Sequence, residues 1–166
     1  PVAVHQPLGA RRAPLARAGF EGKILVVTGG PEGLGGAIAL ESARLGAAGV
    51  VVSGRNAENG QRVADEAAEI GSESLFVEAD LADVDATRAI VSACDERFGR
   101  IDGLVNAAAM TTRGPIASTT VDLWDYLFAV NVRAPFLLTQ ARVQIMRREK
   151  PSGSIANPTP PAARRG

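Results

Sequence analysis

Short runs of apolar residues alternate with longer amphipathic stretches through the middle of the chain. The short runs are rich in β-branched residues, and the longer stretches repeat apolar residues with the spacing of a helix. This alternation predicts strand–helix–strand units that build a parallel sheet. The predicted strands span 23–28, 50–53, 75–79, 101–106 and the start of a fifth at 153–157.

Helices are predicted between these strands, over 33–45, 56–70, 83–98 and from about 120 to 148. Asn56 and Asp83 are placed to cap two of them, because their side chains can accept hydrogen bonds from free amides of the first turn. Pro135 lies inside the long helix, where its missing amide predicts a kink near Ala134 or a break into two helices. The first helix has apolar residues roughly on one face, namely Leu34, Ile38, Ala39 and Leu45. In the second, Val63, Ala67 and Ile70 are predicted to face inward, and the apolar positions of the third include Val84, Ala89, Val91 and Phe98.

Right-handed crossovers place such strands in the order 3-2-1-4, with the fifth beyond the fourth. The predicted fold is therefore an α/β, Rossmann-type doubly wound parallel sheet that stops after the start of its fifth strand. We assign residues 20–157 to this incomplete domain. Residues 1–19 are interpreted as a flexible N-terminal extension and residues 158–166 as a disordered tail.

The composition, with 46% hydrophobic and 22% charged residues, is ordinary for a soluble globular protein. Because 18 basic residues balance 18 acidic ones, no net field favours nucleic acid or an anionic membrane as a partner. The single cysteine, Cys94, cannot form an internal disulfide, and no apolar run reaches the roughly 18 residues of a membrane span. We expect a cytoplasmic protein, with organellar targeting by residues 1–19 as the alternative. Neither Cys94 nor His5 has a local setting that suggests a ligand, so no metal site is predicted.

The stretch from Thr28 to Gly35 joins the first strand to the first helix and contains four glycines. Glycine at this turn lets a pyrophosphate approach the helix N-terminus, where free amides and the helix dipole favour negative charge. A tight turn without a ligand is the alternative interpretation. The spacing also differs from the common Gly-x-Gly-x-x-Gly pattern, since the turn glycines fall at Gly29, Gly33 and Gly35.

The pattern Thr-Gly-x-x-x-Gly-x-Gly resembles the cofactor motif of the short-chain dehydrogenase/reductase family. Further matches are Asp80-Leu81 after the third strand, Asn106-Ala107-Ala108-Ala109 after the fourth, Asn131 in the long helix, and Gly153-Ser154-Ile155-Ala156-Asn157 in the fifth strand. Ala109 replaces a glycine that the family usually carries. The resemblance covers about residues 20–157 and implies an NAD(P)-dependent oxidoreductase that transfers hydride between nicotinamide and a carbonyl or alcohol.

The resemblance implies a set of cofactor-binding residues and one member of the family's catalytic tetrad. The cofactor-binding residues are Thr28, Gly29, Gly33, Leu34, Gly35, Arg55, Asp80, Leu81, Asn106 and Ala107. Asp80 would contact the adenine, although a helix cap or a solvated strand end would also explain it. Asn106 is expected to support neighbouring strands, and Asn131 would be the tetrad asparagine, with a satisfied polar helix residue as its alternative.

Gly54 and Arg55 end the second strand, where an acidic residue would bind the ribose hydroxyls of NAD and repel a 2′-phosphate. A basic residue without an acid at this place favours NADP over NAD. Glu32, in the phosphate turn, points the other way, because NADP-preferring relatives often carry a basic residue there. We therefore predict NADP as the preferred cofactor and keep NAD as the alternative.

The family's remaining catalytic residues, a serine and Tyr-x-x-x-Lys, are absent. A lysine cation beside the tyrosine favours the phenolate and brings its pKa toward the working pH. Here the one tyrosine, Tyr126, is followed four residues later by Val130, and the only lysines are Lys23 and Lys150. We therefore expect this chain to be catalytically inactive by itself.

A cofactor- or partner-binding module is the alternative function. It would associate with a full-length subunit, or as a homo-oligomer, through the helix at 120–148, which lies at the dimer interface in relatives. Without the segment that normally follows, apolar surface and an unpaired strand edge should be exposed. The substrate is not identified, although Met110, Thr111 and Arg113 are candidates for one side of its pocket.

Overall fold

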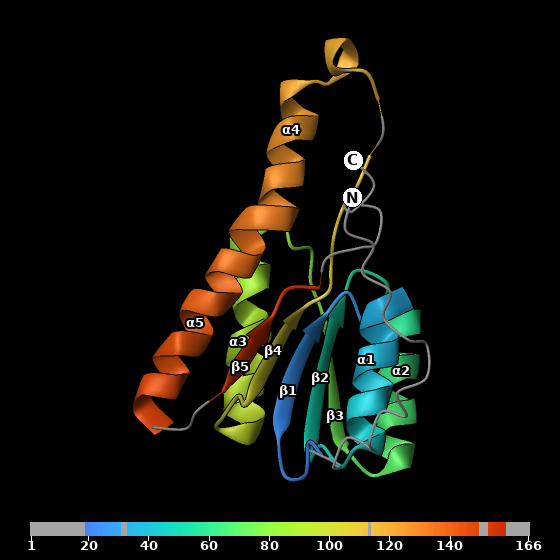
Figure 1. Cartoon of the computed structure of the whole chain (residues 1–166), viewed down its shortest axis with the longest axis vertical. Helices are drawn as coiled ribbons and strands as arrows, with labels where there is room; N and C mark the ends of the chain where they lie inside the picture. The colour runs from blue at the N-terminus through green and yellow to red at the C-terminus, as the bar shows by residue number, and fades with distance from the viewer. Residues whose placement is uncertain (1–18, 31–32, 113, 150–152, 159–166) are drawn as a thin grey trace, which may run out of the picture.

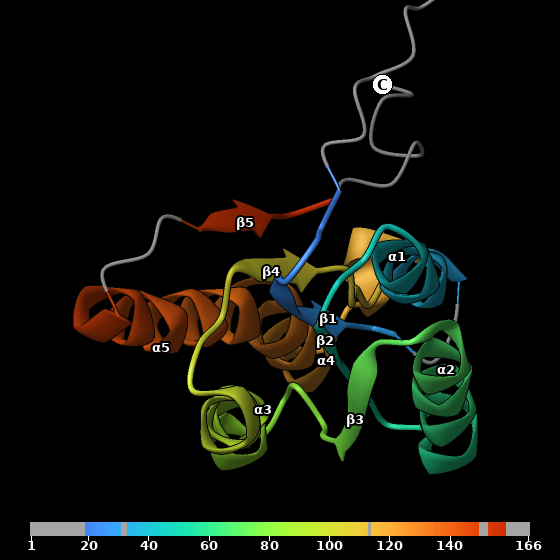
Figure 2. The same ribbon diagram turned by 90° about the horizontal axis from the view of Figure 1, so that it is seen from below.

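The computed structural model describes residues 19–30, 33–112, 114–149 and 153–158, which form a single parallel sheet with helices on both faces (Figures 1 and 2). The sheet has five strands in the order β3-β2-β1-β4-β5. The strands are β1 (Ile24–Thr28), β2 (Gly49–Gly54), β3 (Glu73–Glu78), β4 (Gly103–Asn106) and β5 (Ser154–Ala156). The predicted fold class and strand order are confirmed. The predicted extension at 1–19 and tail at 158–166 lie outside the described residues, apart from Gly19 and Pro158.

The helices form two layers, one on each face of the sheet. The helices are α1 (Gly33–Arg44), α2 (Ala57–Ile70), α3 (Val84–Phe98), α4 (Val121–Phe128) and α5 (Ala134–Glu149), with a short helix η1 (Ile116–Ser118) and a connecting segment η2 (Ala129–Arg133). Figure 2 shows α1 and α2 on one face and α3 and α5 on the other, and Figure 1 shows α4 extending past the carboxyl ends of the strands.

The side chains of β1 alternate between two cores, because successive residues of a strand point to opposite faces. Ile24 and Val26 join a cluster with residues of α3 and α5, whereas Leu25 and Val27 join a cluster with residues of α1 and α2. Every residue of β1 is buried, as are the first five residues of β2. This two-sided burial explains why the strand sequences are continuously apolar rather than alternating.

The helices begin and end where the sequence predicts. Asn56 Oδ1 accepts the Asn59 amide at 2.9 Å, and Asp83 Oδ1 accepts the Ala86 amide at 2.7 Å. Gly71 ends α2 in the left-handed conformation, with φ of 114°.

Ile70 is predicted to face inward but is exposed, and so are Leu34 of the apolar face predicted for α1 and Ala89 of the apolar positions in α3. In α1 the buried face is made of small residues, because Gly35 and Gly36 lie against the backbone of Gly29 and Gly30. The neighbouring Leu34 is therefore turned outward.

The predicted long helix consists of two α-helices, α4 and α5, which the segment η2 joins without an intervening loop. The segment η2, just before the proline, is a turn of π-helix, and the Ala134 amide donates to the carbonyl of Ala129, five residues back. Pro135 has no amide to continue the α-helical pattern. The wider π turn accommodates this loss and places an irregularity just before Ala134.

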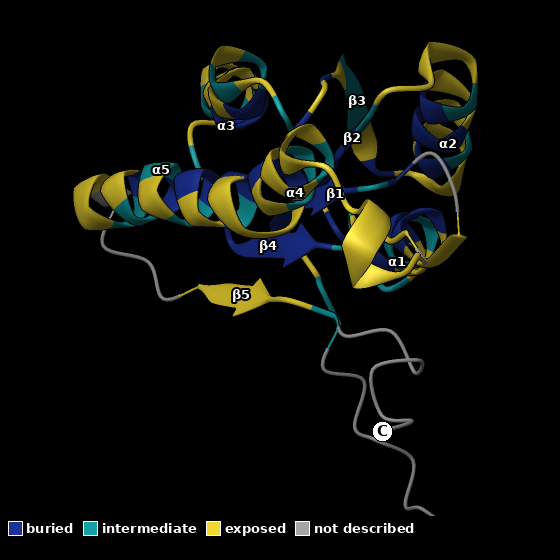
Figure 3. Cartoon of the chain, turned by 90° about the horizontal axis from the view of Figure 1, so that it is seen from above, coloured by how far each residue is buried: buried dark blue, intermediate teal, exposed yellow. Residues whose placement is uncertain are grey.

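The expected exposure of apolar surface is confirmed. The strand β5 pairs with β4 along one edge, and all three of its residues are exposed. The exposed large side chains of the long helix are Val121, Trp124, Phe128, Val132 and Phe136, which we call the apolar stripe. Figure 3 shows that much of α4 is exposed. No helix within the described ranges is both long enough and apolar enough to cross a membrane.

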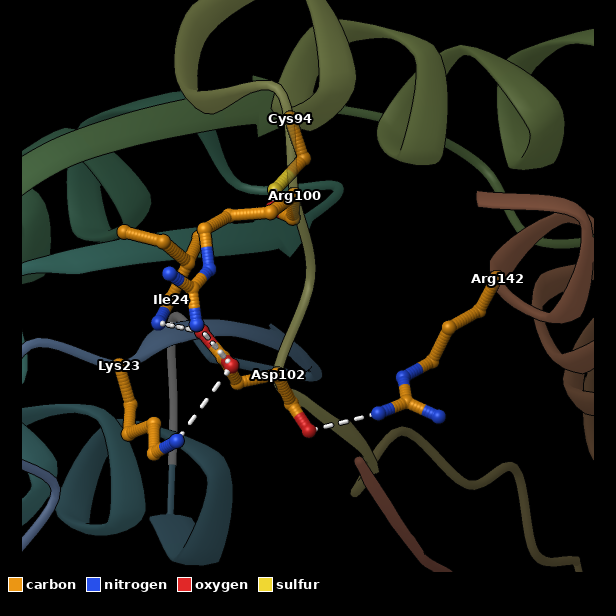
Figure 4. A network of polar contacts seen from close by, with 6 residues as sticks. All are labelled: Lys23, Ile24, Cys94, Arg100, Asp102 and Arg142. Carbon is orange, nitrogen blue, oxygen red and sulfur yellow. Dashed lines mark hydrogen bonds and ion pairs between the residues drawn. The ribbon is translucent and has the colours of Figure 1, made fainter. Parts of the chain in front are cut away.

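The carboxylate of Asp102 lies at the start of β4 and is 7% exposed (Figure 4). Its Oδ2 accepts the Ile24 amide at 2.8 Å, and its Oδ1 accepts Arg100 Nη2 at 2.5 Å and lies 3.6 Å from Lys23 Nζ. Burial acts to raise the pKa of Asp102, but the hydrogen bonds from Arg100 and Ile24 and the charges of Arg100 and Lys23 outweigh it. The pKa therefore lies below its usual value of 3.8.

The main chain of Asp102 connects three further parts of the fold. Its amide donates to the Ile24 carbonyl at 2.8 Å, and its own carbonyl accepts the Ser154 amide at 2.9 Å and Arg142 Nη2 at 2.6 Å. Arg142 comes from α5 and is 1% exposed. Burial lowers the pKa of Arg142, and the opposing charge of Asp102 offsets part of that effect. One residue thus joins β1, β4, β5 and α5.

We expect Asp102→Asn to lower the free energy of unfolding at pH 7 by roughly 2 to 3 kcal/mol, because it removes a buried charge that three groups surround. Since the folded pKa is below the unfolded one, this contribution is present above about pH 4 and is lost as the pH falls through the folded value. Urea unfolding at pH 7 and pH 3 measures both quantities. The exposed Glu96→Gln is the control, and equal losses in the two variants would contradict the prediction.

Candidate cofactor-binding site

The turn between β1 and α1 brings main chain unusually close to main chain. Gly29 and Gly33 have φ of 70° and 60°, a conformation that favours glycine. A Cβ at Gly29 would lie 2.7 Å from the Ala108 main chain, and a Cβ at Gly35 would overlap the Gly29 carbonyl and lie 2.9 Å from the Gly30 nitrogen. These close approaches explain why glycine is required at both positions, and a glycine turn before a helix N-terminus is typical of phosphate binding.

A cavity of about 320 Å³ lies at the carboxyl ends of the strands, beside this turn. Neighbouring strands β1 and β4 connect to helices on opposite faces, and the crevice at such a switch point is where open α/β sheets bind ligands. The cavity is lined by Gly29, Gly54, Arg55, Asn56, Ala79, Asp80, Leu81, Ala107, Ala108, Ala109, Met110, Tyr126 and Val130.

The structure brings five of the predicted cofactor-binding residues together around this cavity: Gly29, Arg55, Asp80, Leu81 and Ala107. The others, Thr28, Gly33, Leu34, Gly35 and Asn106, do not line it. Of the turn, Pro31 and Glu32 lie outside the described residues.

Two polar residues at the rim already have protein partners. Asp80 Oδ1 accepts the Ala82 amide at 2.9 Å, so the local turn accounts for one of its oxygens. The helix cap is the neighbouring Asp83 and not Asp80. Arg55 is exposed, and its Nη1 donates to the hydroxyl of Tyr126 at 2.9 Å. Both residues line the cavity, so they offer a ligand side chains of opposite charge.

Thr28 and Asn106 lie below the cavity and tie strands together. The Thr28 hydroxyl accepts the Ala108 amide at 3.3 Å and donates to the Val105 carbonyl at 3.5 Å. Asn106 Nδ2 donates to Asn157 Oδ1 at 2.8 Å. This agrees with the expectation that Asn106 supports neighbouring strands.

Asn131 lies in the π turn and clamps the segment that follows β4. Its Oδ1 accepts the Met110 amide at 2.8 Å, and its Nδ2 donates to the Met110 carbonyl at 2.7 Å. Both polar atoms of the side chain are satisfied by one residue of the main chain. The amide thereby fixes Met110, which lines the cavity.

The sequence did not identify Tyr126 and Val130 as cavity residues. They are four residues apart on the long helix and so share one of its faces, but only the path of the chain after β4 brings that face over the cavity. The spacing of four residues indicates that Tyr126 and Val130 share a helix face, but no sequence pattern indicates that this face lies over the cavity.

The described ranges contain no cluster of metal-ligating side chains, and Cys94 is buried. No group of three or more His, Cys, Asp or Glu side chains there could hold a metal ion. Burial, with smaller effects of Asp95 and Asp102, raises the pKa of Cys94 to about 12, so its thiol is protonated near neutral pH.

A family model described as short chain dehydrogenase matches residues 23–165, which is most of the chain. The chain belongs to the short-chain dehydrogenase family. The match includes the glycine turn, the cavity and the clamped Asn131, so the resemblance inferred from the sequence is confirmed.

Individual relatives agree with the family match. The short-chain dehydrogenase/reductase FrzI of Cladobotryum sp is 36% identical over 87% of this chain and 55% of FrzI. The short chain dehydrogenase/reductase dpmpG of Macrophomina phaseolina is 34% identical over 87% of this chain and 84% of dpmpG. A metagenomic short-chain oxidoreductase, crystallised in complex with NADP, has 37% identity and a TM-score of 0.77 over 83% of this chain and 62% of its own. The chain spans 44% to 55% of the length of three curated relatives that it matches.

We expect Gly35→Ala to weaken both the fold and nucleotide binding, because the new methyl group would collide with the main chain of Gly29 and not with a movable side chain. The loss of stability should be about 1 to 3 kcal/mol. Gly114→Ala is the matched control, since its methyl group would meet nothing closer than Ser118 Oγ at 3.9 Å. Thermal unfolding and NADPH titration measure the two effects. A Gly35→Ala variant that behaves like the control would show that the close approach is unimportant.

Proposed function

We propose that residues 20–157 form the NADP(H)-binding part of an oxidoreductase that acts on a carbonyl or an alcohol. The observation that carries the proposal is Arg55, which stands at the cavity rim directly after β2, where Gly54 offers no carboxylate to repel a 2′-phosphate. The NADP complex of the metagenomic relative supports the same cofactor.

The residues present fit such a cofactor. The glycines at Gly29, Gly33 and Gly35 clear a path to the N-terminus of α1, which suits a pyrophosphate. The cavity between Arg55, Asp80 and Val130 would take the adenosine, with Asp80 and Leu81 beside the adenine. Thr28, Leu34, Asn106 and Ala107 would support this arrangement from the strand ends and the first turn of α1. Bound NADP(H) would supply the hydride.

We further propose that the 166 residues by themselves bind cofactor without turnover. The hydroxyl of Tyr126 receives the guanidinium of Arg55 and has no lysine four residues later. Lys23 lies at the opposite end of β1, near Asp102. Asn131 would be the one member of the catalytic tetrad, with its side chain holding Met110. A general acid and base for the reaction would have to come from other residues of the whole protein.

Fluorescence titration with NADPH and NADH tests this function. We expect NADPH to bind about tenfold more tightly than NADH, because the guanidinium makes charge-assisted hydrogen bonds with a phosphate. Arg55→Gln should remove the difference, whereas the control Arg44→Gln on the far end of α1 should keep it. Tighter NADH binding would reverse the cofactor preference, and NADPH oxidation with any ketone or aldehyde would contradict the absence of turnover.

A second candidate function, association with another subunit, is favoured by the apolar stripe. Trp124 and Phe128 stack with ring centroids 4.5 Å apart, yet both are about half exposed. Several exposed apolar side chains along one helix, two of them stacked, are typical of an interaction surface. We propose that the stripe packs against a second copy of the chain or against a complete subunit of the same family.

Sedimentation measurements test this association. Phe136→Lys should weaken self-association at least about tenfold, because it places a charge within an apolar contact. Ile116→Lys is the matched control, since Ile116 is 94% exposed and lies outside the stripe. A wild-type chain that stays monomeric and that also fails to bind a complete relative would rule out the second function.

A further inference from the structure

The hydrogen bond between Arg55 and Tyr126 spans two distant parts of the chain. Arg55 follows β2, Tyr126 lies on α4, and both line the cavity. Their sequence separation is 71 residues, so the contact depends on the folded arrangement of sheet and helix. It places a cation on one wall of the cavity against a neutral hydroxyl on the other.

The two partners differ in how firmly they are held. Tyr126 is partly buried and its ring packs against the core cluster beneath α3 and α5. Its helix is capped by Thr120, whose hydroxyl accepts the Leu123 amide at 3.2 Å. Arg55 is exposed and lies just beyond the end of its strand. Tyr126 is thus the fixed partner, and Arg55 is the residue whose side chain it orders.

A phenol can order a guanidinium without neutralising it. A carboxylate would compete with a phosphate for the arginine charge, but none forms an ion pair with Arg55 in the described part of the chain. The bond to Tyr126 uses one of the five N–H donors of the guanidinium and leaves the others for a ligand. A free arginine side chain would lose more conformational entropy when it binds, so this prior ordering favours affinity.

We propose that Tyr126 is a positioning residue that sets the preference for NADP by holding Arg55 where the 2′-phosphate of the adenosine binds. The inference rests on the proposed function, because it requires Arg55 to contact that phosphate. It assigns to the single tyrosine of the chain a role in cofactor selection and not in proton transfer.

Calorimetric titration with 2′,5′-ADP and 5′-AMP tests the proposal, because these probes differ only in the 2′-phosphate. Tyr126→Phe removes one oxygen and keeps the ring that packs on the core. We expect it to weaken 2′,5′-ADP binding about three- to tenfold and to leave 5′-AMP binding unchanged. In an Arg55→Gln background the same change should have no effect on either probe, because its action passes through the arginine.

The outcomes separate this inference from the proposed function. If Arg55→Gln removes the preference for 2′,5′-ADP and Tyr126→Phe does not, the positioning role is wrong and the NADP preference stands. If Arg55→Gln leaves the preference intact, the NADP assignment itself fails. Equal weakening of both probes by Tyr126→Phe, or a lowered thermal midpoint that accounts for the loss, would show a merely structural role. Tighter 2′,5′-ADP binding would mean that the tyrosine competes with the phosphate.

Discussion

The strand β1 is hydrogen-bonded to β2 on one side and to β4 on the other, and helices bury both of its faces. Parallel strands are stable only when both faces are covered, so the position of β1 fixes where α1 and α3 can pack. The glycine turn leaves the carboxyl end of β1, and the buried carboxylate of Asp102 holds its opposite end to β4. The candidate site therefore lies at the carboxyl end of β1, and the hydrogen bond from Ile24 to Asp102 holds the amino end of the same strand.

The amino-acid pattern predicts the sheet well because two-sided burial leaves a direct mark on the sequence. The local signals are the apolar runs of β1 and β2 and the glycines that follow α2 and α3. They locate the strands and helices, and the rule that crossovers are right-handed then gives the strand order. The orientation of single helix residues is harder to predict. Leu34 and Ala89 follow a helical period, yet the small residues of α1 and the buried Ile90 in α3 decide which face is inside.

The polar geometry of the site depends on contacts between residues far apart in the sequence, which no local pattern specifies. The bond from Arg55 to Tyr126 and the clamp of Asn131 on Met110 arise only when the long helix returns across the strand ends. The resemblance to the family singles out Asn131 and Asn106, whose hydrogen-bond partners in the structure are the main chain of Met110 and the side chain of Asn157. In the folded chain, Asn131 and Asn106 therefore make structural hydrogen bonds that support the segments around the cavity.

The π turn at Ala129–Arg133 sets the angular relation between the two halves of the long helix. Each residue of an α-helix advances the side-chain direction by about 100°, and a π turn accommodates one residue more than the regular helix does. The inserted residue thus decides that Tyr126 looks over the cavity while Leu138 and Ile145 face the core. Deleting a single residue from this turn would rotate α4 relative to α5 by about a quarter of a revolution. Other side chains of α4 would then face the cavity, although the sequence of α4 itself would be unchanged.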